Sequence, residues 1–470
     1  MGHNDIALIG LGVMGSNLAL NIADHGYKIA VYNYTPDLVE KFQKENPHPN
    51  AEAFTDIKEM VASLTVPRKI VIMVTAGKAV DSVLKALDGL IEKDDVVLDL
   101  GNSNYEDTRA RSIELDKKGI IYAGVGVSGG AEGARRGPAI MPGGTQESYK
   151  LVGKILEDIS AKADDGKPCC AYMGTDGAGH YVKMVHNGIE YADMQLIAES
   201  YLVLKQLGNF NNQELADIYK RYNDGALKSY LISITAKVLA EKNPYKSGEL
   251  IDDIVDSAGQ KGTGKWTAIS GFSMGVDLSL IDSACNSRFT SALVKDRETR
   301  VNNFAKPLKT TDINKEELIQ DIENCLYLGK IAAYAQGFAL YKAGSDAYGW
   351  NLNLGKIAEI FRGGCIIQAR FLNDITKAFA ANPQLGNLID APFFKEGINR
   401  CLPSARKIAA LAISNGIPAP AFLQAISYID AMSSAIVGAN VIQGLRDYFG
   451  AHTFTLKHNG EVIHHNWNAK

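Results

Sequence analysis

One predicted helix carries five side chains of the types that move protons. His186, Asn187, Glu190 and Tyr191 follow Lys183 at offsets of three, four, seven and eight residues. At about 3.6 residues per turn, these offsets share one helix face. An amine, an imidazole, an amide, a carboxyl and a phenol on one face indicate an acid/base site. A structural polar network gives the same pattern, so the helix alone leaves both interpretations open.

Two or three domains are expected to position this helix, because 470 residues exceed one ordinary hydrophobic core. The composition, 46% hydrophobic and 22% charged with a net charge of −4, is typical of a soluble globular protein. It argues against a nucleic-acid or membrane partner. No apolar run reaches the roughly 18 residues of a membrane span. Residues 1–5 lack the features of a signal peptide, so we expect a cytoplasmic protein.

The cysteines predict reduced thiols rather than a disulfide framework. None of the six lies in a Cys-x-x-Cys pair, and the nine histidines show no metal-ligand spacing with them. We therefore expect no bound metal. The six are Cys169, Cys170, Cys285, Cys325, Cys365 and Cys401.

The N-terminal part predicts a Rossmann dinucleotide-binding fold. Residues 5–9 suit a buried parallel strand, Gly10-x-Gly12-x-x-Gly15 and an amphipathic helical stretch follow, and residues 28–33 form a second strand. The glycine motif indicates dinucleotide binding here because it lies in a strand, turn, helix and strand within about 30 residues. The glycines let the backbone approach a pyrophosphate, and the helix N-terminus supplies amides and a favourable dipole.

Further strands are predicted to begin at residues 69, 96 and 120. Each leads into small or polar residues, and the carboxyl ends of strands in an open α/β sheet are where ligands bind. A tight turn is the alternative for each segment. The segments are Thr75-Ala76-Gly77, Gly101-Asn102-Ser103 and Ser128-Gly129-Gly130.

The end of the second strand, Asn33-Tyr34-Thr35, leaves the choice of cofactor open. Enzymes that use NAD usually place a carboxylate there for the ribose hydroxyl, and those that use NADP often place an arginine. This strand end has neither, so its local chemistry selects no cofactor.

Long helical patterns replace the strands from residue 179 to about 436, with breaks near Lys242, Lys306 and Asn382. Within them, Asp256–Trp266 is a glycine-rich basic loop whose Lys261 and backbone amides suit a phosphate. Trp266 stands where a Walker A loop needs Ser or Thr, so we interpret this as another kind of phosphate loop, with a solvated turn as the alternative.

The last residues, 437–470, carry aromatic side chains but little apolar surface for a core of their own. A disordered tail would not need these aromatics. Docking on another subunit and packing on the chain's own helical part are both open.

Three motifs together resemble the 6-phosphogluconate dehydrogenase family. They are Lys183-Met-Val-His-Asn-Gly-Ile-Glu-Tyr, Asp256-x-x-Gly-Gln-Lys-Gly-Thr-Gly-x-Trp266 and Arg446-Asp-Tyr-Phe-Gly-Ala-His452. The resemblance covers essentially the whole chain. It implies a Rossmann domain at 1–178, an all-helical substrate and dimerisation domain at 179–436, and a tail at 437–470 that reaches the partner of a homodimer.

The resemblance also implies the site residues. Lys183 would be the general base and Glu190 the acid, beside His186 and Asn187. The cofactor would meet Gly10, Gly12, Val13, Met14, Gly15, Asn33, Tyr34, Thr35, Val74, Thr75, Ala76 and Asn102. Substrate C1 and its hydroxyls would meet Asn102, Ser128, Gly129, Gly130, His186 and Asn187. The substrate phosphate would meet Tyr191, Lys261, Thr263 and Arg288, with Arg446 and His452 from the partner. For Arg288 taken alone, a surface ion pair is the simpler interpretation.

The implied reaction is the oxidative decarboxylation of 6-phosphogluconate to ribulose 5-phosphate and CO2. A neutral lysine takes the proton of the 3-hydroxyl as hydride leaves, the 3-keto acid loses CO2, and an acid protonates the enediol. No step requires a metal. Burial and nearby cations are expected to lower the pKa of Lys183.

The chain departs from the family pattern at the cofactor loop, where Tyr34 replaces the usual arginine. We therefore expect NADP with weakened selectivity and possible use of NAD. Smaller departures lie at Thr75, Leu100-Gly101, Ala131 and Ala192.

Two other functions compete with this one. A shorter β-hydroxyacid dehydrogenase would share the Rossmann start and the lysine, but it lacks the phosphate loop and the tail. A catalytically silent dinucleotide-binding protein would not need Lys183, Asn187 and Glu190.

Overall fold

The computed structural model describes residues 2–301, 303–304 and 312–467. The chain divides into two compact units, Met1–Ala425 and Ile426–Lys470. The predicted helix break at Lys306 and the last three residues of the predicted tail lie outside the described residues. The domain limits 1–178, 179–436 and 437–470 stay predictions.

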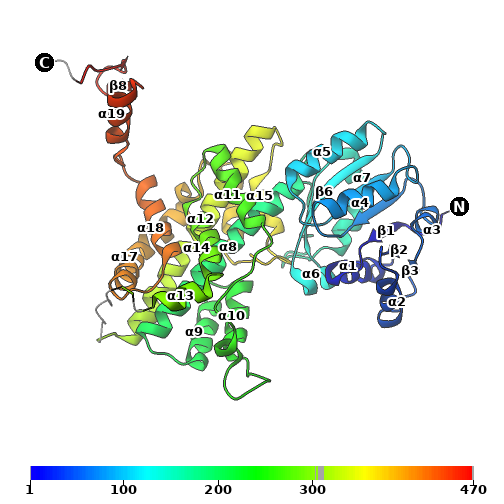
Figure 1. Cartoon of the computed structure of the whole chain (residues 1–470), viewed down its shortest axis with the longest axis horizontal. Helices are drawn as coiled ribbons and strands as arrows, with labels where there is room; N and C mark the ends of the chain where they lie inside the picture. The colour runs from blue at the N-terminus through cyan, green and yellow to red at the C-terminus, as the bar shows by residue number, and fades with distance from the viewer. Residues whose placement is uncertain (1, 302, 305–311, 468–470) are drawn as a thin grey trace. The chain divides into compact units, whose positions relative to one another are not determined.

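A seven-stranded sheet opens the first unit, in the order β3-β2-β1-β4-β5-β6-β7 (Figure 1). The first six strands run parallel, and β7 runs antiparallel to β6. The order reverses between β1 and β4, which is where a doubly wound sheet forms its ligand crevice. The strands are β1 (Ile6–Ile9), β2 (Ile29–Tyr32), β3 (Ala51–Phe54), β4 (Lys69–Ile72), β5 (Val96–Asp99), β6 (Ile121–Ser128) and β7 (Ala139–Pro142).

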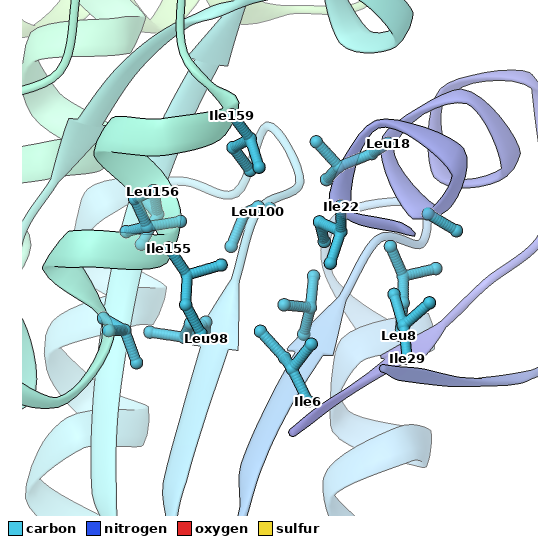
Figure 2. Packing of buried hydrophobic residues seen from close by; sticks show 14 of the residues in the cluster. Ile6, Leu8, Leu18, Ile22, Ile29, Leu98, Leu100, Ile155, Leu156 and Ile159 are labelled. Carbon is cyan, nitrogen blue, oxygen red and sulfur yellow. The ribbon is translucent and has the colours of Figure 1, made fainter. Parts of the chain in front are cut away.

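Helices cover both faces of the sheet because strand residues alternate in direction. Ile6 and Leu8 point to one face with α1 and α7, whereas Ala7 and Ile9 point to the other with α3 and α4. Figure 2 shows Leu18 and Ile22 of α1 and Ile155 and Ile159 of α7 over the first face. The helices of this part are α1 (Val13–Asp24), α2 (Pro36–Glu45), α3 (Ile57–Ala62), α4 (Lys78–Leu87), α5 (Tyr105–Asp116), α6 (Gly130–Arg136) and α7 (Gln146–Ile159).

The rest of the first unit is helical, so the predicted Rossmann domain followed by a large all-helical domain is confirmed. Two long helices, α8 and α14, lie side by side at its centre. The helices are α8 (Ala178–Leu207), α9 (Asn212–Asp224), α10 (Tyr230–Ala240), η1 (Leu250–Asp253), α11 (Thr263–Met274), α12 (Ser279–Ser291), α13 (Val294–Arg300), α14 (Lys315–Tyr348), α15 (Leu354–Ile360), α16 (Leu372–Ala381), η2 (Leu388–Asp390) and α17 (Pro392–Ser414), followed by α18 (Pro420–Met432), which continues past Ala425 into the second unit.

Helix α8 packs backbone to backbone against β6 through glycines. A Cβ at Gly126 would come within 2.5 Å of the Lys183 Cβ, and one at Gly179 within 2.3 Å of the Gly124 carbonyl oxygen. Such contacts leave no room for a side chain between the helix and the strand. The first turns of α8 are therefore held directly on the sheet.

A buried ion pair joins α8 to α14. The Lys330 ammonium binds the Asp193 carboxylate, and both side chains are almost fully excluded from water. Removing one member of such a pair leaves an uncompensated charge in the interior.

The second unit contains α19 (Ala439–Gly450) and a small hairpin of β8 (Phe454–Thr455) and β9 (Val462–Ile463). The fully buried Asp447 holds it together. Its carboxylate accepts hydrogen bonds from the Thr453 amide at 2.9 Å, the His465 amide at 3.1 Å and the Trp467 indole at 2.8 Å. Along the outside of α19, Ile442, Leu445 and Phe449 are more than half exposed.

All six cysteines are buried free thiols. None of the helices within the described residues combines the length with the hydropathy that a bilayer crossing requires.

Replacing Asp193 with alanine should destabilise the fold by about 3–5 kcal/mol, because Lys330 would keep a buried charge without a partner. Chemical denaturation measures this change. The matched control is Asp217→Ala, which removes an exposed partner of Lys220 on α9 and should cost under about 1 kcal/mol. Equal losses in the two variants would show that burial of the pair does not matter.

Candidate active site

The five predicted side chains lie together on α8, inside the first unit. Lys183 is 6% exposed, His186 is fully buried and Asn187 is 9% exposed. The carboxyl of Glu190 retains 22% exposure, so it lies at the edge of the buried group. Burial on this scale excludes the solvated surface stripe that charged residues usually form.

A chain of hydrogen bonds orients the first members. The Lys183 ammonium donates to Oδ1 of Asn187 at 2.8 Å. Nδ2 of Asn187 donates to Oγ1 of Thr263 on α11 at 2.9 Å. The amide therefore presents its oxygen to Lys183 and its NH2 group to the phosphate loop. Lys183 and Thr263, which were predicted to serve different parts of the site, are joined through one side chain.

The surroundings move the pKa values of the acid and the base toward each other. Burial lowers the pKa of Lys183, and the carboxylate of Glu190 opposes that shift only in part. Burial raises the pKa of Glu190, against the attraction of Lys183 and Arg288. A lysine that releases its proton easily and a carboxyl that holds its proton are suited to be a general base and a general acid.

The side chain of His186 points from α8 toward the segment that carries Phe361 and Cys365, which was not expected at the site. Its Nε2 lies 3.0 Å from Oγ of Ser128 at the end of β6 and 2.9 Å from Sγ of Cys365. The Phe361 ring meets it edge-on at 5.2 Å. Burial, followed by the charge of Lys183, puts the pKa of His186 well below its usual value, so the ring is neutral. Cys365 and Phe361 gave no signal in the sequence.

Tyr191 and Arg288 form the other end of the site. The Arg288 guanidinium lies over the Tyr191 ring, 4.6 Å from its centre, and donates to the Gly259 carbonyl at 2.8 Å. A Cβ at Gly264 would come within 2.5 Å of the same ring, so the first turn of α11 packs closely against it. Arg288 thus makes a cation–π contact rather than the surface ion pair considered above. Lys261 lies in the same loop and is exposed.

The predicted cofactor residues follow the carboxyl ends of β1, β2, β4 and β5, and the strand order reverses between β1 and β4. Gly10 has a φ of +112°, which only glycine adopts readily, and a Cβ at Gly15 would collide with the Gly10 carbonyl at 1.8 Å. A Cβ at Gly12 would meet nothing within 4 Å, so its side faces open space at the N-terminus of α1. This cradle fits a pyrophosphate. Val13 and Met14 begin α1, and Val74, Thr75 and Ala76 follow β4.

In the loop after β2, the side chain of Asn33 is held by a hydrogen bond and the side chain of Tyr34 is exposed. Oδ1 of Asn33 accepts the Leu11 amide at 3.0 Å, whereas Tyr34 is 91% exposed. Thr35 precedes α2, whose first turn carries the carboxylate of Asp37. Asp37 lies beyond the strand end from which the cofactor was predicted, so this carboxylate was not among the expected residues. No basic side chain lies among residues 33–37.

Asn102, Gly129 and Gly130 follow the ends of β5 and β6, at the same sheet edge as Ser128. Gly129 and Gly130 have φ values of +118° and +64°, which the turn into α6 requires. Asn102 lies within a turn held by Asp99, which accepts from the Gly101 amide at 3.0 Å and from the Ser103 hydroxyl at 2.6 Å.

Arg446 and His452 belong to the second unit, and their assignment to the substrate phosphate stays a prediction. Within the described residues, no group of three or more His, Cys, Asp or Glu side chains is arranged to hold a metal ion.

Comparison with known proteins identifies two matching family profiles. The NAD binding domain of 6-phosphogluconate dehydrogenase matches residues 5–174, and the C-terminal domain of 6-phosphogluconate dehydrogenase matches residues 179–467. Together they span both the sheet and the helical part.

Individual relatives agree along the full chain. The NADP(+)-dependent decarboxylating 6-phosphogluconate dehydrogenase of Bacillus subtilis (strain 168) is 47% identical, over 99% of this chain and 100% of the relative. The NAD(+)-dependent decarboxylating enzyme of the same organism is also 47% identical, over 99% of each chain. A 6-phosphogluconate dehydrogenase structure from Plasmodium falciparum superposes with a TM-score of 0.94 at 40% identity, covering 98% of this chain and 100% of the other.

Full-length similarity of this kind, together with the buried lysine and carboxyl on α8, establishes what the protein is related to. The chain belongs to the family of decarboxylating 6-phosphogluconate dehydrogenases.

Proposed function

We propose that this enzyme oxidises and decarboxylates 6-phospho-D-gluconate to D-ribulose 5-phosphate and CO2 through a 3-keto intermediate, with Lys183 as the base. The observation that carries the proposal is the pairing on α8 of a buried lysine, bound to Asn187, with a largely buried carboxyl one turn beyond His186. Their pKa values are shifted in the directions that the two proton transfers need.

The substrate would lie with its phosphate at Tyr191, Lys261, Thr263 and Arg288. These residues surround one loop, where a guanidinium and backbone amides can neutralise a phosphate. Its carboxylate end would lie at the sheet edge, near Asn102, Ser128, Gly129, Gly130 and His186. Asn187 lies between the two ends and can hydrogen-bond a hydroxyl, since it reaches from Lys183 to Thr263.

In the oxidation step, neutral Lys183 accepts the proton of the 3-hydroxyl. A nicotinamide cofactor held at the glycine cradle would supply the acceptor for the hydride of carbon 3. A lysine at its ordinary pKa is protonated near neutral pH and cannot act as a base, so the lowered pKa is required for the step.

In the decarboxylation step, protonated Lys183 hydrogen-bonds the new 3-keto oxygen and stabilises the charge that develops as CO2 leaves. Glu190 then protonates the enediol at the carbon that lost CO2. The raised pKa of Glu190 keeps the proton available for this transfer.

We propose NADP as the cofactor, with NAD as an alternative. The glycine cradle at Gly10, Gly12 and Gly15 suits the pyrophosphate of either one. Tyr34 can stack on the adenine but offers no charge to a 2′-phosphate, and Asp37 adds a nearby carboxylate. Relatives of both cofactor classes have equal identity to this chain, so identity does not choose between them.

We also propose a homodimer in which the tail of each subunit completes the site of the other. Supporting this, Ile442, Leu445 and Phe449 expose apolar surface along α19, and Arg446 on the same helix is exposed. The partner's site would gain Arg446 and His452 at the phosphate. A cytoplasmic location stays a prediction, with six free thiols in its favour.

Lys183→Ala and Lys183→Arg should both lower kcat by roughly 10³-fold or more, because neither side chain can act as a base at neutral pH. Formation of reduced cofactor with 6-phosphogluconate measures kcat, and calorimetry measures substrate binding, which should persist. Arginine keeps the positive charge, so it separates proton abstraction from electrostatic binding. An arginine variant with near-normal turnover would contradict the assignment of the base.

Tyr34→Arg should raise kcat/KM for NADP by roughly 10-fold to 100-fold, because a guanidinium would meet the 2′-phosphate. The value for NAD should change by under about threefold. Tyr34→Glu is the matched control and should shift the NADP to NAD ratio in the opposite direction. Equal effects on both cofactors would mean that this residue does not read the 2′-position.

Mixing two inactive variants tests the exchanged tail. Lys183→Ala and Arg446→Ala, denatured and refolded together, should regain up to about a quarter of wild-type activity, because half the dimers are mixed and each mixed dimer has one intact site. Each variant refolded alone is the control. If Arg446 served its own subunit, every site in the mixture would lack one residue and no activity would return.

A further inference from the structure

The segment between α15 and α16, residues 361–371, returns from the helical part to the sheet and brings Cys365 to His186. The Gly364 carbonyl accepts the Ala139 amide of β7 at 2.7 Å. Gly364 has a φ of +62°, and a Cβ there would come within 2.4 Å of the Gly137 carbonyl. The backbone beside Cys365 is therefore tightly fixed, and the sulfur is placed as firmly as the residues of α8.

We propose that Cys365 is a positioning residue whose thiol donates a hydrogen bond to Nε2 of His186 and keeps the hydrogen of that ring on Nδ1. Sγ lies 2.9 Å from Nε2. The proposal deepens the proposed function, on which it rests for the role of Ser128.

The tautomer of His186 follows from the orientation of Asn187. Lys183 donates to Oδ1 of Asn187, and turning the amide would bring its NH2 group against the ammonium. Oδ1 therefore stays on this side, 3.0 Å from Nδ1 of His186. A carbonyl oxygen only accepts, so this contact favours the tautomer with the hydrogen on Nδ1. In a neutral ring, Nε2 is then an acceptor and needs a donor.

Two donors face Nε2: the Ser128 hydroxyl at 3.0 Å and the Cys365 thiol. In the proposed substrate complex, Ser128 meets the substrate carboxylate, which is a stronger acceptor than a neutral imidazole. The hydroxyl then turns to the substrate. Cys365 is the donor that stays, so the ring keeps its tautomer while the substrate is bound.

A nucleophilic role fits the same contacts less well. Cys365, His186 and Asn187 have the order of a thiol, imidazole and amide triad. Burial, however, raises the pKa of the Cys365 thiol to about 12, despite the opposing charge of Lys183, and the residue is 3% exposed. A thiol that stays protonated is a donor and not a nucleophile.

The tautomer of His186 matters because it affects the pKa of Lys183. With the hydrogen on Nε2, Nδ1 would become an acceptor 3.4 Å from the Lys183 ammonium. An added acceptor favours the charged lysine and raises its pKa. Two other groups act on this amine: the Glu190 carboxylate on the same helix and the neutral Cys365 thiol. Arg288 of α12 lowers the pKa of Glu190 in turn. From β6, the uncharged Ser128 faces His186.

Cys365→Ala and Cys365→Ser test the proposal in the full-length enzyme. Alanine removes the donor, whereas serine keeps one. Alanine should lower kcat roughly tenfold with little change in KM for 6-phosphogluconate, and serine should stay within about threefold of wild type. Cys325→Ala, which removes another buried thiol from α14, is the matched control and should leave kcat unchanged.

The pH profile separates positioning from packing. Activity falls as the pH drops through the Lys183 pKa, because the base becomes protonated. In Cys365→Ala this acid limb should move to higher pH, and in Cys365→Ser and Cys325→Ala it should not. Equal kinetic losses in the alanine and serine variants with an unmoved limb would overturn the proposal, as would an alanine variant indistinguishable from wild type.

Nitrogen-15 NMR of histidine-labelled enzyme gives a reading that does not depend on turnover. With Ser128→Ala, which removes the competing hydroxyl, His186 should retain the Nδ1–H tautomer. It should lose that tautomer in the double variant that also carries Cys365→Ala. Failure of the proposed reaction would appear as an inactive wild type, whereas failure of this inference would appear as a tautomer that is the same with and without Cys365.

Discussion

Exclusion of water from the Lys183 amine is the constraint on which the rest of the first unit depends. A lysine gives up its proton near neutral pH only where its charged form is poorly solvated. Three distant parts of the chain provide that environment: Gly126 of β6, Thr263 of α11 and the segment that carries Cys365. The buried environment of Lys183 therefore needs the sheet and the helical part together.

Local patterns predicted much of this architecture. The glycine turn between two apolar strands indicated the doubly wound sheet, because its motif depends on residues that are neighbours in the sequence. The face of α8 was predictable for the same reason, since helical spacing alone brings Lys183, Asn187 and Glu190 together. The short strand β3 and the antiparallel β7 were not predicted, because each pairs only at an edge of the sheet.

The remaining features depend on contacts between distant residues. Cys365 lies 179 residues from His186 in the chain, and the Lys330–Asp193 pair spans 137 residues. Neither pairing leaves a periodic signal in the sequence. The assignment of Arg446 and His452 to the phosphate came from family resemblance, and it stays a prediction because both residues lie in the second unit.

The glycine contact between β6 and α8 has a consequence for engineering. A Cβ at Gly126 would collide with the Lys183 Cβ, and one at Gly179 with the Gly124 carbonyl oxygen, so close backbone packing fixes the distance between β6 and the proposed base. Cofactor loops on one side and the phosphate loop on the other can then be redesigned separately. The distance between the bound cofactor and the proposed base would then stay the same in such variants, because the contact between β6 and α8 would not change.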